Sequence, residues 1–492
     1  MEFWSFPPAY DENFLPEAGD RYWFPSRETM PVVERERAIF ERLKTVCRYA
    51  YEHAPFYRRK WDEAGFHPSH LKSLEDCETR VPVIQKKDLR EAQDRMPPFG
   101  DYLCVPEGEV FHIHGTSGTT GRPTAFAISR ADWRAIANAH ARIMWGMGLR
   151  PGDTICVAAI FSLYMGSWGA LAGAERLGAK CFPFGAGAQG MSARCVQWLA
   201  MLKPTAFYGT PTYALHLAQV AEEERISPRA FELKYMFFSG EPGASIPAIR
   251  DKLQNLFGAK VFDCGSMAEM TPWMNVAGSA ATDGMLCWQD VVYTEVCDPT
   301  TLRRVPYGQR GTPVYTHLER TSQPMIRLLS GDLTLWVNEP NPCGRTYPRL
   351  PQGIFGRIDD MFTIRGENVY PSEIDKALNE LQHYGGEHRV IISRASTMDE
   401  LLLRVEADQE TYSNGAAEIE HFRQQVERKM LGVLGLRSVV QILAPGSLPR
   451  TDFKARRVVD DRAVFREIRA QIEKTGPEAA PPRWPDGSIG PP

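Results

Sequence analysis

The stretch HIHGTSGTTGRPT, residues 112–124, is dominated by Ser, Thr and Gly. Backbone N–H groups at closely spaced glycines, together with Ser and Thr hydroxyls, can all donate to one anion. An arginine after the last glycine adds a fixed positive charge that suits phosphate oxygens. We therefore predict a phosphate-binding loop. Its predicted contacts are Thr116, Ser117, Gly118, Thr119, Thr120, Gly121 and Arg122.

Two other interpretations of this loop are weaker. It is not a Walker A loop, because Arg122 and Pro123 follow Gly121 where that motif has Lys and then Ser or Thr. It could be a solvated Ser/Gly linker, as its composition alone allows. The strand-like runs EVFHIH and TAFAISR on either side instead favour a hairpin turn.

Bulk composition is that of a globular protein, with 43% hydrophobic and 24% charged residues among 492. This length predicts two or three domains. A formal net charge of −4 gives no general attraction to nucleic acid or an anionic membrane. No apolar run reaches the roughly 18 to 20 residues that span a bilayer, and the ten cysteines form no C-x-x-C pair. We expect a cytoplasmic enzyme whose cysteines are free thiols. A homodimer is possible.

Short apolar runs alternate with helical patterns between residues 153 and 265. Examples are DTICVAAIF, SWGALAGAERLG, AKCFPFG, SARCVQWLAMLK and TAFYGT. Such β-α-β alternation predicts an α/β fold with a parallel sheet covered by helices, whose ligands bind beyond the carboxyl ends of the strands. Apolar residues at helical spacing predict helices in residues 31–63.

The pattern changes after this region. Short strand-like runs punctuated by Pro, Gly and Asn predict a small antiparallel β unit at 285–354. We predict a large domain at 1–356 and a smaller, mobile α+β domain at 357–475. A Pro- and Gly-rich tail at 476–492 is expected to be disordered.

The run GTSGTTGRPT resembles the phosphate loop of the adenylate-forming enzymes, which include acyl-CoA synthetases, luciferases and peptide-synthetase adenylation domains. The phenylacetate-CoA ligase branch is the most similar, since it has a His shortly before the loop, here His114, and Thr after its Pro, here Thr124. The resemblance extends from YAYEHAPFYRRKWDEAGF to LPRTDFKARRVVD, nearly the whole chain. It implies ATP and coenzyme A as substrates beside the acid, and Mg²⁺ as a cofactor.

Two further motifs would contact the nucleotide by this resemblance. FFSGEP, residues 237–242, would lie along the adenine through Gly240, Glu241 and Pro242. In FDCGSMAEM, Asp263 would lie near the adenine, and Glu269 would hold Mg²⁺, a hard cation that prefers carboxylate oxygen.

The FDCGSMAEM segment also departs from the family pattern. Gly265 replaces the aromatic residue that stacks on adenine, and Ala268 replaces a hydroxyl residue. We expect adenine to be held less tightly as a result. For Glu269 alone, the other interpretation is a surface carboxylate.

Three later motifs complete the resemblance. In RLLSGDLT, Asp332 would accept the ribose hydroxyls, although an Asp after Gly is also common in turns. In FGRIDDMFTIRGENVYPSEI, Arg357 would lie near ribose and phosphate, and Arg365 on a loop of the mobile domain beyond a hinge at Asp359.

The third of these motifs, SLPRTDFKARRVVD, places Lys454 at the position of the catalytic lysine. Phe453 replaces the usual Gly before it. Because arginines surround Lys454, a solvated basic patch is the other interpretation.

The acid pocket is expected around FSLYMGSWGA, residues 161–170. Flat apolar walls from Phe161, Tyr164, Trp168 and Tyr208, with space at Gly166, would fit an aromatic ring, unless these are ordinary core residues. The resemblance implies ATP-dependent activation of an aromatic acid and transfer to coenzyme A. Transfer to an amine or carrier protein, and a non-catalytic binding protein with this fold, are the alternatives.

Overall fold

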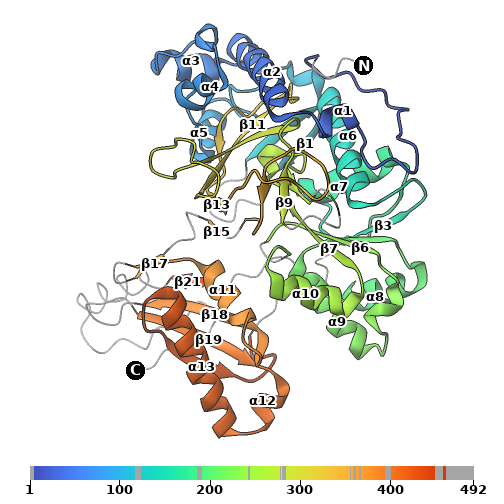
Figure 1. Cartoon of the computed structure of the whole chain (residues 1–492), viewed down its shortest axis with the longest axis vertical. Coiled ribbons are helices and arrows are strands. Elements are labelled where there is room, and N and C mark those ends of the chain that lie inside the picture. The colour runs from blue at the N-terminus through green and yellow to red at the C-terminus, as the bar shows by residue number, and fades with distance from the viewer. Residues whose placement is uncertain are drawn as a thin grey trace. The chain divides into compact units, whose positions relative to one another are not determined.

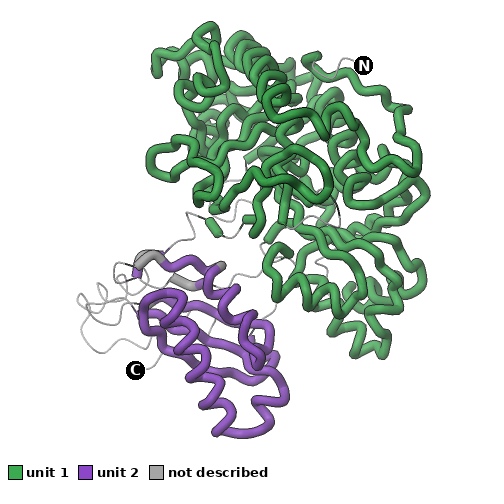
Figure 2. Tube along the Cα trace, viewed as in Figure 1, with its two compact units in different colours: residues 1–358, 452–454 green, residues 359–451, 455–492 purple. Residues whose placement is uncertain are grey.

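The computed structural model describes residues 5–116, 124–185, 191–241, 244–277, 279, 284–354, 356–357, 362–364, 367–393, 400–448 and 458–460. The predicted tail at 476–492 lies outside them. The chain divides into two units, one holding residues 1–358 and the other beginning at residue 359 (Figure 2).

Helices dominate the first hundred residues (Figure 1). They are α1 (Pro25–Glu28), α2 (Val32–His53), α3 (Pro55–Glu63), α4 (Leu74–Arg80) and α5 (Lys86–Arg95), with short 3-10 turns at Pro68–His70 and Glu107–Glu109. Ile39, Leu43, Val46 and Ala50 are buried along one face of α2, as the helical spacing predicts. The helices predicted in 31–63 are confirmed.

The phosphate-loop segment is carried by a hairpin. Strand β1 (Val110–Gly115) pairs antiparallel with β2 (Ala125–Ser129), and Gly115 lies opposite Ala125. The predicted hairpin is therefore present. Helix α6 (Arg130–Met147) follows at once, because the Ser129 hydroxyl accepts a hydrogen bond from the Asp132 N–H and caps the helix.

The central sheet has the predicted parallel core. Its strands β3 (Thr154–Val157), β4 (Lys180–Phe182), β5 (Ala206–Gly209), β6 (Tyr235–Phe238) and β7 (Lys260–Gly265) lie in the order β4-β3-β5-β6-β7. The intervening helices are α7 (Met165–Leu177), α8 (Met191–Leu202), α9 (Pro211–Glu223) and α10 (Pro247–Phe257). Gly178 ends α7 with φ +79°, the predicted C-cap.

Three short antiparallel strands extend this sheet beyond the prediction. They are β8 (Asn275–Val276), β9 (Met285–Cys287) and β14 (Arg349–Leu350), and they continue the sheet outward from β7. A separate antiparallel sheet joins β10 (Val292–Cys297), β11 (Arg310–His317), β13 (Asp332–Leu335) and β15 (Gly356–Arg357), with β12 (Leu328–Leu329) beside β11. The antiparallel unit predicted at 285–354 is thus divided between two sheets.

The second unit has an α+β architecture. Its described strands are β16 (Phe362–Ile364), β17 (Glu367–Val369), β18 (Tyr384–Ser393), β19 (Glu400–Ala407), β20 (Val439–Leu443) and β21 (Val458–Asp460). Helices α11 (Pro371–Asn379), α12 (Gln409–Ser413) and α13 (Ala416–Leu434) accompany them. Its own core includes Ile374, Leu378, Phe422 and Val426. The predicted fold class is confirmed.

Two predictions from bulk composition can be compared with this fold. All ten cysteines are free, as expected, and nine of them are buried. In the described part of the chain, no helix combines the length and the apolar character needed to cross a bilayer.

A buried ionic network ties the N-terminal segment to the large unit. The Glu28 carboxylate accepts hydrogen bonds from Arg142 Nε (2.9 Å) and Arg345 Nε (2.7 Å). Arg142 also pairs with Asp290, which Arg27 contacts in turn. Burial raises the pKa of Asp290, but these two arginines outweigh burial and hold it below its usual range.

We predict that Glu28→Gln destabilises the large unit by about 3 to 5 kcal/mol, because it leaves buried arginine charge uncompensated. Chemical denaturation measures the loss. Lys203→Gln, which removes an exposed ion pair with Glu232, is the matched control and should cost about 1 kcal/mol or less. Equal, small losses in both variants would show that the network contributes no more than a surface pair.

Candidate active site

The ends of the predicted phosphate loop are held together by the hairpin. The Thr116 N–H donates to the Thr124 carbonyl (3.2 Å), and the Gly115 N–H donates to the Leu163 carbonyl (3.3 Å). A Cβ at Gly115 would lie 2.8 Å from the Thr124 carbonyl oxygen, so glycine is required there. The predicted contacts Ser117, Gly118, Thr119, Thr120, Gly121 and Arg122 lie outside the described residues.

Glu269 lies on a 3-10 turn (Ala268–Met270) that follows β7, and its side chain is buried. Its Oε1 forms an ion pair with Lys86 Nζ at 3.0 Å. Lys86 is the first residue of α5, and its side chain is one-third exposed. The charge of the buried Glu269 carboxylate is therefore compensated by a lysine, and its role as a magnesium ligand stays a prediction.

No sequence motif identifies Lys86 as a site residue. In QKKDLR it is one of two adjacent lysines, a pattern typical of a solvated helix start. Among the described residues, no group of three or more His, Cys, Asp or Glu could hold a metal ion. A magnesium ion beside Glu269 would therefore need oxygens from the nucleotide that brings it.

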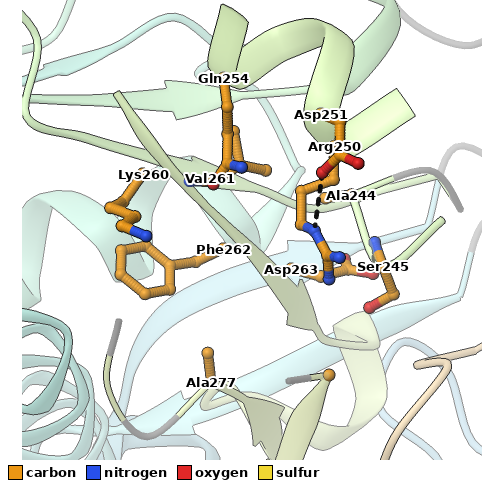
Figure 3. A pocket seen from close by; sticks show the side chains of 11 residues that line it. Ala244, Ser245, Arg250, Asp251, Gln254, Lys260, Val261, Phe262, Asp263 and Ala277 are labelled. Carbon is orange, nitrogen blue, oxygen red and sulfur yellow. Dashed lines mark hydrogen bonds and ion pairs between the residues drawn. The ribbon is translucent and has the colours of Figure 1, made fainter. Parts of the chain in front are cut away.

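Asp263 is one of the residues that line a small cavity (Figure 3). The cavity has a volume of about 170 Å³, and its lining residues are Ala244, Ser245, Arg250, Asp251, Gln254, Lys260, Val261, Phe262, Asp263, Ala277 and Gly284. Whole-ligand pockets usually exceed roughly 300 Å³, so this cavity alone is smaller than a usual ligand site. Burial raises the pKa of Asp263 to about 6, and Oδ2 accepts a hydrogen bond from the Ser245 N–H (3.1 Å).

Gly265 does not face open space. A Cβ there would lie 3.2 Å from Asn275 Cβ and 3.4 Å from Met285 Sδ, and both of these residues are buried. Gly265 also pairs with Asn275 across β7 and β8. The space next to Gly265, where an aromatic side chain would begin, is thus filled by two other side chains.

The turn after β6 is fixed by its glutamate. Gly240 has φ +92°, and Glu241 Oε1 accepts hydrogen bonds from both the N–H (2.7 Å) and the hydroxyl (2.6 Å) of Thr212. Since Thr212 lies at the start of α9, Glu241 anchors the turn to that helix. Pro242 lies outside the described residues.

Asp332 and Arg357, which are 25 residues apart, meet in the structure. They lie opposite each other on β13 and β15, and Arg357 Nη1 donates to Asp332 Oδ1 at 3.1 Å. The two residues predicted at the ribose thus come together as an ion pair. The other two predicted residues of this part of the chain, Arg365 and Lys454, lie outside the described residues.

The residues predicted to line the acid pocket fall into two groups. Tyr164 Oη lies 3.0 Å from Ser239 Oγ and 3.4 Å from Tyr208 Oη, and Tyr208 Oη lies 2.5 Å from Ser239 Oγ. Trp168 instead packs edge-on against Phe161 and donates to the Ser162 carbonyl (2.8 Å). The structure therefore does not join these four aromatic residues in one flat wall.

Gly166 leaves no free space, contrary to the prediction. A Cβ at this position would lie 2.5 Å from Tyr208 Oη and 2.6 Å from Tyr164 Cζ. The two tyrosines occupy the room that the glycine provides. Ser239, which the sequence analysis did not select, lies between their hydroxyls.

Family models and known proteins match most of this chain. Residues 61–315 match the family described as AMP-binding enzyme, and residues 366–462 match the AMP-binding enzyme C-terminal domain. Phenylacetate-coenzyme A ligase of Thermus thermophilus is 34% identical over 89% of this chain and 99% of its own length. The Escherichia coli K12 phenylacetate-coenzyme A ligase is 32% identical over 89% of this chain and 97% of its own length.

This chain belongs to the AMP-binding enzyme family, in its phenylacetate-CoA ligase branch. It is an AMP-forming acid–thiol ligase. A crystal structure of a 2-hydroxyisobutyryl-CoA ligase in the postadenylation state is 70% identical, covers 96% of this chain and all of its own, and superposes with a TM-score of 0.91. That relative has also been solved with CoA in an open conformation and in a thioesterification state.

We predict that Gly265→Tyr raises the KM for ATP and lowers stability, because the ring must displace Met285 from a packed site, an overpacking that costs about 1 to 3 kcal/mol. ATP-dependent pyrophosphate release and thermal melts measure both effects. Gly265→Tyr combined with Met285→Ala restores room and should recover stability. A lower KM in the single variant would mean that the ring reaches the adenine without displacing Met285.

Proposed function

We propose that this enzyme activates a short-chain 2-hydroxy carboxylic acid with ATP and transfers the acyl group to coenzyme A. The observation that carries this proposal is the 70% identity to a 2-hydroxyisobutyryl-CoA ligase across 96% of the chain. The phenylacetate-CoA ligases match over a similar span but at only 31–34% identity.

The predicted acid pocket supports a small, polar substrate. Two tyrosine rings fill the room beside Gly166, and their hydroxyls gather around Ser239. An aryl ring needs flat apolar walls and space, whereas a small hydroxy acid needs hydrogen-bonding groups at a short distance. An aromatic acid remains the second candidate, because relatives that carry the name phenylacetate-coenzyme A ligase cover most of this chain.

In the first step, a carboxylate oxygen of the acid attacks the α-phosphorus of ATP. The bond from that phosphorus to the bridging oxygen breaks, giving an acyl-adenylate and pyrophosphate. This transfer needs charge neutralisation and alignment more than proton transfer. We assign the residue 116–122 loop to the β- and γ-phosphates and Asp332 with Arg357 to the ribose side.

The magnesium ion that accompanies ATP would find a carboxylate at Glu269. The residue fits this role because it offers carboxylate oxygen, and its present partner Lys86 is one-third exposed and can move aside for the ion. The ion supplies charge neutralisation for the triphosphate. Lys86 keeps the buried carboxylate compensated when no nucleotide is bound.

In the second step, the coenzyme A sulfur attacks the acyl carbon. The bond from that carbon to the phosphate oxygen breaks, AMP leaves, and the thiol proton is lost. We propose that the second unit changes its orientation between the steps, as the separate states of the 2-hydroxyisobutyryl-CoA ligase suggest. Transfer to an amine or carrier protein is disfavoured by the acid–thiol ligase relatives. The homodimer and cytoplasmic location stay predictions.

We predict that the enzyme converts MgATP, 2-hydroxyisobutyrate and coenzyme A to AMP, pyrophosphate and the thioester, with a higher kcat/KM than for phenylacetate. Chromatography of nucleotides and thioesters measures all products. A higher kcat/KM for phenylacetate would show that the substrate is an aromatic acid, the second candidate, and not a 2-hydroxy acid. ADP as the nucleotide product would contradict both.

We predict that Lys454→Ala loses most of the adenylation step, with kcat and kcat/KM falling together, as expected for an interaction made in the transition state. The same variant, given synthetic acyl-adenylate, should still form thioester with coenzyme A. Arg457→Ala, in the same basic segment, is the control and should keep both half-reactions. A full adenylation rate in Lys454→Ala would support the solvated-patch interpretation. Equal losses in both half-reactions of a folded variant would contradict the change of orientation.

A further inference from the structure

Two side chains hold the backbone just beyond Glu269. They come from residues 317–323, a buried stretch at the end of β11 that we call the bracing loop. Arg320 Nη2 donates to the Thr271 carbonyl at 2.6 Å, and His317 Nε2 lies 3.2 Å from the same oxygen. Thr271 ends the 3-10 turn that carries Glu269. The position of that turn therefore depends on the bracing loop.

The hydrogen-bond role of His317 is fixed by its other ring nitrogen. Nδ1 accepts from the Met325 N–H (3.0 Å), so the proton of the neutral ring is on Nε2 and is donated to the Thr271 carbonyl. Burial and the nearby charge of Arg320 lower the pKa of His317 well below its ordinary value, which keeps the ring neutral. The Thr271 carbonyl therefore accepts two hydrogen bonds, one from each side chain.

The bracing loop also contacts the phosphate-loop hairpin. Ser322 Oγ donates to the Ala127 carbonyl of β2, and Gln323 Oε1 accepts from the Ala127 N–H, both at 2.7 Å. Asp132, near the start of α6, accepts from the Thr321 N–H (2.6 Å) and the Ser322 N–H (2.9 Å). The loop is thus fixed both to the strand that closes the hairpin and to the helix that follows it.

Arg320 is unusual because its charge has no carboxylate partner. The residue is only 5% exposed, yet no Asp or Glu of the described part of the chain forms an ion pair with it. Burial lowers its pKa, and Asp132 opposes this only at longer range. Buried arginines are usually paired, as Arg142 and Arg345 are with Glu28. A buried charge kept without such a partner calls for another explanation.

An anion bound at Arg320 is one explanation, but the space there is too small. The cavity that Arg320 lines has a volume of about 10 Å³, which is room for one water molecule. Asp132 and Glu319 also line it, and their carboxylates would repel an anion. The guanidinium therefore serves the Thr271 carbonyl, to which it makes a short, charge-assisted hydrogen bond.

We propose that Arg320 and His317 are positioning residues for the adenylation step. Through the Thr271 carbonyl, they fix Glu269 relative to the phosphate-loop hairpin, so that both elements meet the same triphosphate. This inference rests on the role of Glu269 in the proposed function. Groups that orient a metal ligand are worth about 10- to 100-fold in metal affinity or activity when they are removed. Neither positioning residue contacts ATP or the acid in this assignment.

The first test uses the protein without nucleotide or metal. Hydrogen exchange followed by mass spectrometry reports on the Met270 and Met274 amides, which both donate within the segment 265–274. Arg320→Met should speed exchange in this segment about tenfold, the effect of one hydrogen bond on a local opening. The variant should still fold and melt close to the wild type, because His317 keeps its hydrogen bond and no ion pair is broken.

The second test measures binding of Mn²⁺ together with α,β-methylene-ATP, from the loss of the EPR signal of free Mn²⁺. Arg320→Met should weaken Mn²⁺ binding about tenfold or more. Arg320→Lys keeps a charged donor and should recover part of this loss. In a Glu269→Gln background, Arg320→Met should have no further effect, because the carboxylate that it positions has been removed.

Tyr57→Phe is the matched control. The Tyr57 hydroxyl is buried, donates to the Pro324 carbonyl (2.6 Å) and accepts from the Ile326 N–H (3.2 Å). These contacts lie next to the bracing loop and do not involve the turn of Glu269. This variant should therefore change neither hydrogen exchange in the segment 265–274 nor Mn²⁺ binding.

Faster exchange in Arg320→Met together with weaker Mn²⁺ binding supports the inference. If either quantity is unchanged, or if the loss of Mn²⁺ binding persists in the Glu269→Gln background, the inference is wrong. Full Mn²⁺ binding by Glu269→Gln alone would contradict the role of Glu269, and the inference with it. None of these measurements depends on which acid is activated. A failure of the proposed substrate therefore appears separately, in the assay of products, and leaves the inference standing.

Discussion

The shared register of three parallel strands is the constraint on which the candidate site depends. Tyr208 lies opposite Phe237 across β5 and β6, and Phe238 lies opposite Asp263 across β6 and β7. A slip of one residue would turn every side chain of a strand to the other face of the sheet. The same backbone hydrogen bonds therefore position both the Tyr208 hydroxyl beside Ser239 and the Asp263 carboxylate at the carboxyl edge of the sheet.

Buried carboxylates serve two different purposes in the large unit. Glu28 uses both oxygens for buried arginines, so its charge is fully compensated and its position fixed. Glu269 is also buried, but it pairs with Lys86, whose side chain is one-third exposed. An ammonium group on a flexible stem can move aside with little loss of packing, whereas a guanidinium held in a network cannot. This difference separates a carboxylate fixed within the fold from one whose ion-pair partner can move.

The fold was predictable where the hydrophobic periodicity was strong and where Gly or Pro marked the ends of helices and strands. Long helical patterns and strand–helix alternation between residues 153 and 265 gave the parallel core, and Gly178 marked a helix end. Strands such as Asn275–Val276 are too short to show any alternation, so the antiparallel extension of the sheet was missed. Their positions depend on the edge that β7 offers, which is a tertiary property.

Within the candidate site, the sequence predicted residues with a motif and missed those defined by contact. Asp332 and Arg357 were selected from separate motifs and form an ion pair. Ser239 lies within the FFSGEP motif but was not selected from it, and Lys86 lies in an ordinary-looking helix start; only their contacts distinguish them. The sequence could also not show what fills the space beside a glycine, which is why Gly166 was predicted to face a void.

Gly166 sets how closely the side chains of Tyr164 and Tyr208 can pack. Its missing side chain lets two tyrosines approach within a distance that even a methyl group would forbid, since a Cβ would lie 2.5 Å from Tyr208 Oη. Any larger residue would push the rings apart and separate the hydroxyls from Ser239. A glycine that appears from the sequence to leave space is thus the position where two phenol groups fit.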